Sequence, residues 1–162
     1  MIMIKIVGIL LISVAAIGFG MLYSYSLRLE YKRLLGFQKL ICLIRTRIEC
    51  FNQPLSEIYT DFSEESLDEC GFTAELKRSG YVPALCKYKD HLTIRSEILA
   101  VLADFGSGLG KSFSEEQIRH CDKYISVIEE KVSELEKELP IKSKTARALS
   151  AAAAIMIAII LI

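Results

Sequence analysis

Residues 118 to 139 carry the pattern that most restricts what this chain can fold into. Apolar side chains recur there at alternating steps of three and four residues, and Glu, Lys and Ser fill most of the positions between them. This spacing places an apolar stripe along one side of an α-helix. Because such a stripe is unfavourable in water, it predicts a partner that covers it. The stripe consists of Ile118, Cys121, Ile125, Ile128, Val132, Leu135 and Leu139.

A matching stripe lies in the N-terminal third of the chain. Its main positions repeat every seven residues, and a companion series follows three positions on, which is the seam of a helix that packs lengthwise on another helix. The main series is Leu27, Leu34, Ile41 and Ile48, and the companion series is Phe37, Ile44 and Phe51. Pairing the two stripes in antiparallel directions buries both and predicts a long helical hairpin.

The residues between the two stripes predict three or four short helices, packed at the far end of the hairpin. Pro54 suits the first turn of one helix, and Gly80 closes a second. A third begins near Pro83, and Thr93 is the expected N-cap of a helix that runs to Phe105. No segment alternates like a strand. The predicted fold class is therefore all-α: a membrane-anchored antiparallel hairpin of long helices, with short helices packed into a cytoplasmic helical bundle.

Uncharged apolar runs at 6–25 and 148–162 flank this pattern. The first run is about 30 Å long as a helix, which matches the hydrocarbon thickness of a bilayer. Basic residues lie directly inside both runs, and the positive-inside rule then places the charged middle in the cytoplasm; they are Arg28, Lys32, Arg33, Lys142, Lys144 and Arg147. The predicted division is an N-terminal transmembrane anchor at 1–25, a cytoplasmic helical domain at 26–145 and a C-terminal hydrophobic membrane segment at 146–162.

Each apolar run has an alternative interpretation. The first could be a cleaved signal peptide, but its length and the basic residues that follow it favour an uncleaved anchor. The second run is only about 22 Å long as a helix. It either crosses a thin bilayer, stops partway through one, or packs as an apolar helix inside the soluble domain.

Composition argues against several classes of function. The chain has 20 basic and 20 acidic residues, so it offers no electrostatic case for binding nucleic acid. Its five cysteines contain no Cys-x-x-Cys pair, which is poor material for a disulfide framework or a zinc site. The cysteines are expected to be reduced and structural.

The stretch "FGSGLGKS" at 105–112 looks like a phosphate-binding loop but has the wrong spacing. The phosphate loop needs a glycine five positions before Gly110, where this chain has Phe105. It also needs a preceding strand, whereas the residues before 105 have helical periodicity. We expect an elbow between two helices instead, in which Gly106 and Gly108 adopt the left-handed conformation and end the first helix.

In this elbow, Leu109 packs under the turn and Gly110 reverses the chain. Residues 114–117, "SEEQ", form a capping box in which Ser114 caps the last helix and Gln117 reaches back. The elbow motif comprises Phe105, Gly106, Leu109, Gly110, Ser112, Ser114 and Gln117.

No catalytic or metal-binding constellation emerges from the remaining polar residues. His91 and His120 are 29 positions apart with no ligand-spaced partner, so both are expected to be surface histidines. Arg45 and Arg47 lie beside the first seam, where acidic residues of the last helix are their expected partners. The sequence predicts no catalytic residues, no metal ligands and no cofactor.

Taken together, the apolar first run, the long helix, "PL" at 54–55, the elbow and the apolar tail resemble the stage III sporulation protein AB family along essentially the whole chain. The family pattern is Phe/Leu-Gly-x-x-Leu-Gly-x-Ser-Asp followed by a Gln, and this chain has Phe113 where Asp is usual. The matching positions are Phe105, Gly106, Leu109, Gly110, Ser112 and Gln117.

The resemblance implies a component of the channel assembled between mother cell and forespore, located in the mother-cell membrane that faces the forespore. The family's helical core is similar to the cytoplasmic domain of the type II secretion F protein. This similarity implies a non-enzymatic platform that couples a secretion-type hexameric ATPase to other channel subunits in the membrane. The implied partners are the lipid bilayer, that ATPase and those subunits, with no nucleic acid and no small-molecule substrate.

Two other functions remain open from the residues alone. One is a nucleotide-binding switch that uses the Gly106–Ser112 loop. The other is a generic membrane-tethered coiled-coil adaptor that dimerises through the two seams.

Overall fold

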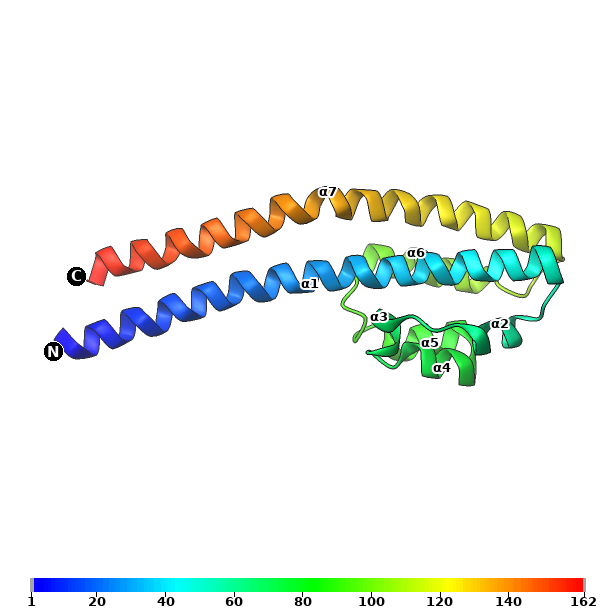
Figure 1. Ribbon diagram of the computed structural model, residues 1–162, viewed down its shortest axis with the longest axis horizontal. Helices are drawn as coiled ribbons and strands as arrows, with labels where there is room; N and C mark the ends of the chain where they lie inside the picture. The colour runs from blue at the N-terminus through cyan, green and yellow to red at the C-terminus, as the bar shows by residue number, and fades with distance from the viewer. Residues whose placement is uncertain (1, 162) are drawn as a thin grey trace. The chain divides into compact units, whose positions relative to one another are not determined.

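The computed structural model describes the backbone of residues 2–161 and the side chains of residues 14, 15, 18–146, 148–153 and 156. Within residues 2–161 every regular element is a helix (Figure 1), so the predicted all-α class is confirmed for this range. The helices are α1 (Ile2–Phe51), α2 (Leu55–Asp61), α3 (Glu65–Asp68), α4 (Phe72–Ser79), α5 (Tyr81–Tyr88), α6 (Ser96–Gly108) and α7 (Ser114–Leu161).

The chain divides into two compact units. The central unit comprises Leu29–Glu134, and the terminal unit comprises Met1–Arg28 together with Leu135–Ile162. The predicted boundaries near 25 and 146 concern placement in a membrane, which the fold does not test, and they stay predictions.

In the central unit, α1 and α7 run side by side in opposite directions (Figure 1). Gln38 donates a hydrogen bond to Glu129 at 3.2 Å, and Arg45 donates one to Asp122 at 2.6 Å. The second contact lies seven residues further along α1 and seven residues earlier on α7, as antiparallel packing of two heptad seams requires. The predicted pairing of the two long helices therefore holds in this unit.

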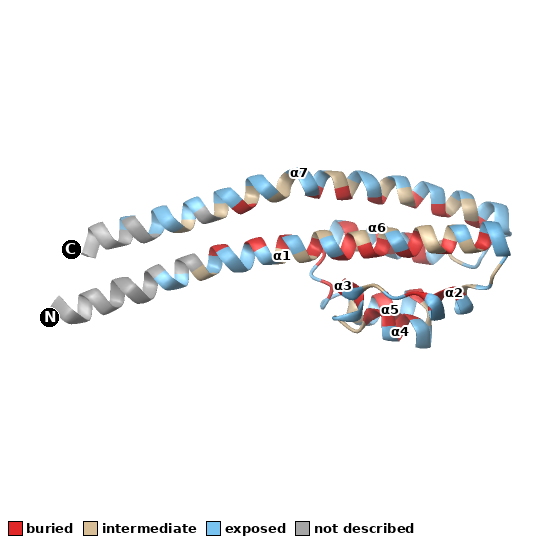
Figure 2. Ribbon diagram, in the orientation of Figure 1, coloured by how far each residue is buried: buried red, intermediate tan, exposed pale blue. Residues whose placement is uncertain are grey.

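Most seam residues are buried, and Figure 2 shows buried positions along both α1 and α7. Leu34, Ile41, Ile48, Ile128 and Val132 of the central unit, and Leu27 and Leu135 of the terminal unit, are buried. Ile118 and Ile125 are half-buried. Phe51 is 68% exposed, so its predicted place in the seam is wrong. It is the last residue of α1, and the chain turns away directly after it.

The short helices pack around a cluster of aromatic rings. Phe37 of α1 contacts Phe72 of α4 edge to face, with ring centroids 5.0 Å apart, and Tyr81 of α5 contacts Phe105 of α6 in the same way at 5.4 Å. All four rings are buried. This cluster joins the short-helix layer to α1 and to α6, so the central unit has one continuous core.

The helix predicted to begin near Pro83 is α5, which begins two residues earlier at Tyr81. Two other details of the short helices need correction. A one-turn helix, α3, was not predicted, because Glu65–Asp68 is too short to show a period. Thr93 is not an N-cap: α6 begins at Ser96, and Thr93 has a left-handed backbone with φ of 51°.

Among the residues that the structure describes, no helix combines the length and the apolar character needed to cross a membrane. Most of the apolar runs at 6–25 and 148–162 lies outside the residues whose side chains are described. The predicted anchor at 1–25 and the membrane segment at 146–162 therefore stay predictions.

Candidate interaction surfaces

The predicted elbow joins α6 to α7, and its backbone is fixed by one side chain. Gly110 has a left-handed φ of 73°, and its N–H donates to Oε1 of Gln117 at 3.2 Å. Nε2 of Gln117 donates to the carbonyl of Gly108, also at 3.2 Å. Gln117 is 5% exposed. Because its amide satisfies both a donor and an acceptor of the turn, the first turn of α7 holds the end of α6 in place.

The other elbow glycines serve a purpose that the sequence analysis missed. Gly106 and Gly108 are helical, and α6 continues to Gly108, so the prediction that they end the helix at Phe105 is wrong. A Cβ on Gly106 would lie 2.6 Å from the ring of Tyr81, and one on Gly108 would lie 2.3 Å from the ring of His120. These positions lack side chains because two rings occupy the space.

His120 is not a surface histidine, contrary to the prediction. It is half-buried, stacks on Phe105 with ring centroids 5.3 Å apart, and lies 4.8 Å from the ring of Tyr124. Its Nε2 is 2.8 Å from the carbonyl of Phe105. The neighbouring Tyr124 hydroxyl donates to Asp104, and burial together with this carboxylate raises the pKa of Tyr124 to about 12. The ring cluster thus fastens α6 to α7 beneath the elbow.

Ser114 also differs from its predicted role. Its hydroxyl donates to Oδ1 of Asn52 at 2.7 Å, and Gln117 bonds the turn, so the capping box predicted for 114–117 does not form. The Ser114–Asn52 bond holds the start of α7 against the residue that follows α1. A shallow hollow lies there between Pro54–Leu55 and Gly110–Ser114.

We call this end of the central unit, residues 51–55 and 109–117, the elbow end. Leu109 is half-buried in it, and Ser112 is exposed. Two aromatic side chains project from it: Phe113 is 88% exposed and Phe51 is 68% exposed. Exposed aromatics on a fixed backbone are the side chains that protein interfaces use as anchors. The elbow end is therefore a candidate contact surface for another protein.

The elbow geometry differs from that of a phosphate loop. Its amides are already bonded within the protein: Leu109 N–H donates to the Gly106 carbonyl at 3.2 Å, and Gly110 N–H donates to Gln117. A phosphate loop leaves such amides free to surround its ligand and follows a strand, whereas this turn follows α6. The arrangement supports the elbow interpretation.

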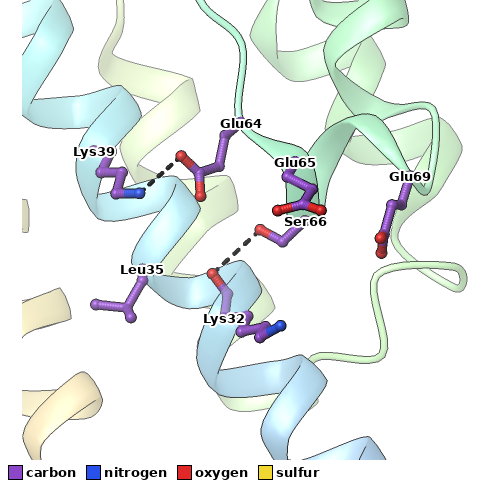
Figure 3. A pocket seen from close by; sticks show the side chains of 7 residues that line it. All are labelled: Lys32, Leu35, Lys39, Glu64, Glu65, Ser66 and Glu69. Carbon is purple, nitrogen blue, oxygen red and sulfur yellow. Dashed lines mark hydrogen bonds and ion pairs between the residues drawn. The ribbon is translucent and has the colours of Figure 1, made fainter.

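A charged hollow lies between α1 and α3 (Figure 3). Lys39 pairs with Glu64 at 2.9 Å, and the Ser66 hydroxyl donates to the carbonyl of Lys32 at 3.3 Å. Glu65 and Glu69 complete its acidic side. The side chain of Lys39 is 63% exposed, so the ion pair is worth roughly 0–1 kcal/mol. These two contacts fasten α3 to α1. The residues that line the hollow do not form a recognisable catalytic or ligand-binding arrangement.

Two buried charged residues of α1, Glu30 and Arg33, form a polar clasp that the sequence patterns did not predict. Arg33, which the sequence places in the basic flank of the membrane anchor, is only 6% exposed. Its guanidinium donates hydrogen bonds to the carbonyls of Ser66 and His91. It also donates one to the hydroxyl of Thr93. Glu30, 4% exposed, accepts hydrogen bonds from Arg95. The signal was available, because Glu30 occupies a position of the apolar companion series, seven residues before Phe37. A charge at a seam position indicates a buried partner.

Arg45 and Arg47 behave differently from each other. Arg45 pairs with Asp122 of α7, as predicted, and with Glu49 of its own helix. Arg47 pairs with Asp61 of α2 at 3.3 Å, and not with the last helix. The two arginines therefore tie α1 to two different neighbours.

Apart from Leu27 and Leu135, which are buried at its border with the central unit's sequence, the described part of the terminal unit buries small residues and exposes large apolar ones. Ser143 of α7 donates to Ser24 of α1 at 3.1 Å, and a Cβ on Gly20 would lie 2.7 Å from Oγ of Ser150. Large apolar side chains of the unit are exposed instead: Val14, Phe19, Met21, Leu22, Tyr23, Tyr25, Ile141, Leu149 and Met156. This arrangement is the reverse of a water-soluble helix pair and typical of helices that associate in lipid.

The described residues contain no group of three or more His, Cys, Asp or Glu side chains placed to hold a metal ion. The five cysteines are free thiols, and burial raises the pKa of the Cys121 thiol to about 11. A thiol with this pKa is unreactive near neutral pH.

Comparison with known proteins identifies one family. The family model described as stage III sporulation protein AB matches residues 5–79 and 81–162. No curated protein and no solved structure matches the chain.

Proposed function

The chain belongs to the stage III sporulation protein AB family, which implies a role in stage III of sporulation, and from this premise we propose that it is a non-enzymatic membrane platform. In this proposal it couples a cytoplasmic, secretion-type hexameric ATPase to other membrane subunits of the channel between mother cell and forespore. Its place is the mother-cell membrane that faces the forespore, with the central unit in the cytoplasm.

The packing of the terminal unit is the observation that carries the membrane part of the proposal. Phe19 and Leu22 are 79% and 67% exposed, whereas Ser24 is 6% exposed. In water this would leave a large apolar surface uncovered at roughly 25 cal/mol per Å². In lipid the same surface costs nothing, and close approach at Gly20 and the Ser24–Ser143 hydrogen bond favour helix association.

The elbow end supports the platform part. Phe113 projects from a turn that is held by the two hydrogen bonds of Gln117 and by the Ser114–Asn52 bond. A side chain held in this way binds a partner at a small entropic cost, since its backbone is already ordered. In this proposal Phe113 and Phe51 contact the ATPase. A platform of this kind transmits force and requires no reactive group of its own.

The test is affinity purification of tagged full-length protein from gently solubilised membranes of sporulating cells. The expected result is recovery of a secretion-type ATPase together with sporulation membrane proteins. Phe113→Ser should reduce recovery of the ATPase several-fold, because it removes the exposed anchor. The control Val82→Ser alters another exposed apolar side chain, 45% exposed on α5, and should leave recovery unchanged.

Recovery of the protein alone, with ATP binding that Lys111→Ala abolishes, would contradict the platform and support the nucleotide switch. If the Phe113 and Val82 variants lose the ATPase equally, the elbow end is not its contact surface. The ATPase would still be a partner of the protein. Recovery of the protein from the soluble fraction would contradict membrane placement.

A further inference from the structure

A third hollow lies in the terminal unit, on the part of α1 where the first apolar run ends. It has a volume of about 290 Å³ and is lined by Met21, Ser24, Tyr25 and Arg28. These positions are spaced by three, four and seven residues from Met21, so they share one face of the helix. The volume is close to the lower end of small-ligand clefts, which is roughly 300 Å³.

Two of the three polar side chains in this hollow make no hydrogen bond or ion pair with the residues that the structure describes. Ser24 is used within the unit, since it donates to the Gly20 carbonyl and accepts from Ser143. By contrast, no hydrogen bond or ion pair joins the Arg28 guanidinium or the Tyr25 hydroxyl to any residue that the structure describes. Arg28 therefore offers its donors, and Tyr25 its hydroxyl, to a ligand outside the protein.

The charge of the terminal unit selects the sign of that ligand. The unit contains six basic residues and two acidic ones. One of the acidic residues, Glu138, already accepts a hydrogen bond from Lys142 at 2.7 Å. Because the two helices are antiparallel, Arg28 lies about 6 Å to one side of the Ser24–Ser143 bond and Lys144 about 1.5 Å to the other, at 1.5 Å per residue. The two basic residues are therefore about 7.5 Å apart along the helix pair. The surroundings of the hollow favour an anion.

The order of side chains along the hollow matches the order of groups in a phospholipid. Met21, on the side of the apolar run, is suited to the first carbons of an acyl chain, and Arg28, about 10 Å further along the helix, is suited to a phosphate. Tyr25 lies between them with an apolar ring and a polar hydroxyl, as tyrosines at membrane interfaces do. A soluble anion would use only Arg28, the last residue in this order.

We propose that this hollow binds an anionic phospholipid, with the headgroup phosphate on Arg28 and Tyr25 and the start of an acyl chain against Met21. The proposal rests on the membrane placement argued above and adds to it a preference for one lipid class. Arg28 binds the phosphate with two parallel N–H···O bonds, and Lys144 adds attraction without direct geometry. Binding there would fix the depth and rotation of α1 at the membrane surface.

The experiment uses purified, delipidated full-length protein in a neutral detergent, with dioleoyl-phosphatidylglycerol or dioleoyl-phosphatidylcholine added at equal concentrations. Bound lipid is counted by native mass spectrometry. We expect a phosphatidylglycerol adduct at least fivefold more abundant than the phosphatidylcholine adduct. Arg28→Gln should remove most of this difference, and Arg28→Lys should retain part of it. Arg119→Gln changes an exposed arginine of the central unit and should have no effect.

Equal binding of the two lipids, or the same preference in Arg28→Gln as in the unaltered protein, would overturn the proposal. A third arm adds millimolar sn-glycerol 3-phosphate. If this soluble phosphate displaces phosphatidylglycerol, the hollow recognises a free phosphate and the lipid assignment is wrong.

Flotation with pure phosphatidylcholine vesicles separates this proposal from the proposed membrane placement. If the protein floats with neutral vesicles but shows no preference for phosphatidylglycerol, the membrane placement stands and the lipid site is wrong. If it does not float with any vesicle, both proposals are wrong. Arg28→Gln should float like the unaltered protein, because the apolar surface that inserts into lipid is unchanged.

Discussion

At the scale of single residues, Gly108 shows how an unremarkable position in a helix is fixed by what lies opposite it. Alanine is ordinarily favoured over glycine inside a helix by roughly 0.5–1 kcal/mol. Here the added Cβ would lie 2.3 Å from the ring of His120. That ring cannot easily move, because Phe105 stacks on it and the Phe105 carbonyl holds its Nε2.

We therefore expect Gly108→Ala to lower the free energy of unfolding by about 1–3 kcal/mol, the range for overpacking a core. Thermal unfolding of the full-length protein in mild detergent, followed by circular dichroism, measures this loss. Ser107→Ala, on the exposed neighbour, is the control and should have little effect. In a His120→Ala background, Gly108→Ala should become neutral or stabilising, and an unchanged loss there would refute the steric explanation.

Arg33 gives the second prediction at this scale. Arg33→Met keeps most of the apolar stem of the side chain but removes the guanidinium, which leaves the carbonyls of Ser66 and His91 without their donor. Unsatisfied buried acceptors cost about 1–3 kcal/mol in the free energy of unfolding. Lys32→Met, on the exposed adjacent residue, should cost far less in the same unfolding measurement. If the free energy of unfolding fell equally in the two variants, the loss would come from removing a positive charge and not from breaking the hydrogen bonds of Arg33.

Residue roles were the part of the molecule that sequence patterns predicted least well. Burial along α1 followed from the heptad spacing, because Leu34, Ile41 and Ile44 face one direction whatever they pack against. Periodicity does not show where a helix ends relative to its partner, so Phe51 was placed in the seam. It also does not show which ring fills the space above a glycine, and for that reason the role of His120 was missed.

At the scale of elements, α4 and α5 are joined by an ion cluster centred on Glu75. This carboxylate accepts hydrogen bonds from Lys87 at 2.5 Å, from Ser79 at 2.5 Å and from Arg78 at 3.0 Å. These bonds, that of Lys87 above all, lower the pKa of Glu75 from 4.5 to about 2. The carboxylate is thus more acidic in the folded protein than in the unfolded chain.

The sign of the pH dependence follows from that difference. The contribution of Glu75 to stability is fully present above pH 4.5 and is lost as the pH falls towards 2, because the unfolded chain binds the proton first. We expect Glu75→Gln to lower the unfolding temperature at pH 6 and to flatten its decrease between pH 4.5 and 2.5. Glu69→Gln, on an exposed glutamate, is the control. A parallel decrease in the Glu75 variant and the unaltered protein would contradict this role.

Element boundaries were predictable where a local signal sets them. Pro54 directly precedes α2, and Gly80, with φ of 86°, separates α4 from α5. The start of α6 differs from the prediction by two residues, because the hydroxyl of Thr93 bonds Arg33 of α1 and not its own helix. A cap residue can be recognised from sequence, but a competing partner 60 positions away cannot.

At the scale of the whole molecule, the two units follow opposite packing rules within the same two helices. In the central unit α1 and α7 bury Leu, Ile and Val. In the described part of the terminal unit beyond Leu27 and Leu135 they bury the small residues Gly20, Ser24 and Ser143. The first rule suits water and the second suits lipid. The sequence pattern predicted the first from heptads. The second was missed, although Gly20 and Ser24 are four residues apart and Ser143 and Ser150 seven, so that each pair shares one helix face.

The last prediction tests whether the small residues pair α1 with α7 of the same chain. Ser24→Cys with Ser143→Cys places two thiols where hydroxyls lie 3.1 Å apart. In a background that lacks the five native cysteines, mild oxidation of vesicle-embedded protein should give an intramolecular disulfide, seen as a faster-migrating monomer without reductant. Phe19→Cys with Ser143→Cys is the control, since Phe19 is 79% exposed and should not cross-link efficiently.

Adding Gly20→Leu to the paired-cysteine protein should reduce the cross-link several-fold, because the new side chain would overlap Ser150. It should not reduce flotation with vesicles, since it adds apolar surface. Leu22→Glu should do the reverse and weaken flotation, because it introduces a charge on the exposed apolar side. A disulfide between two chains, seen as a dimer, would instead favour the coiled-coil adaptor, in which the helix opposite α1 comes from a second copy.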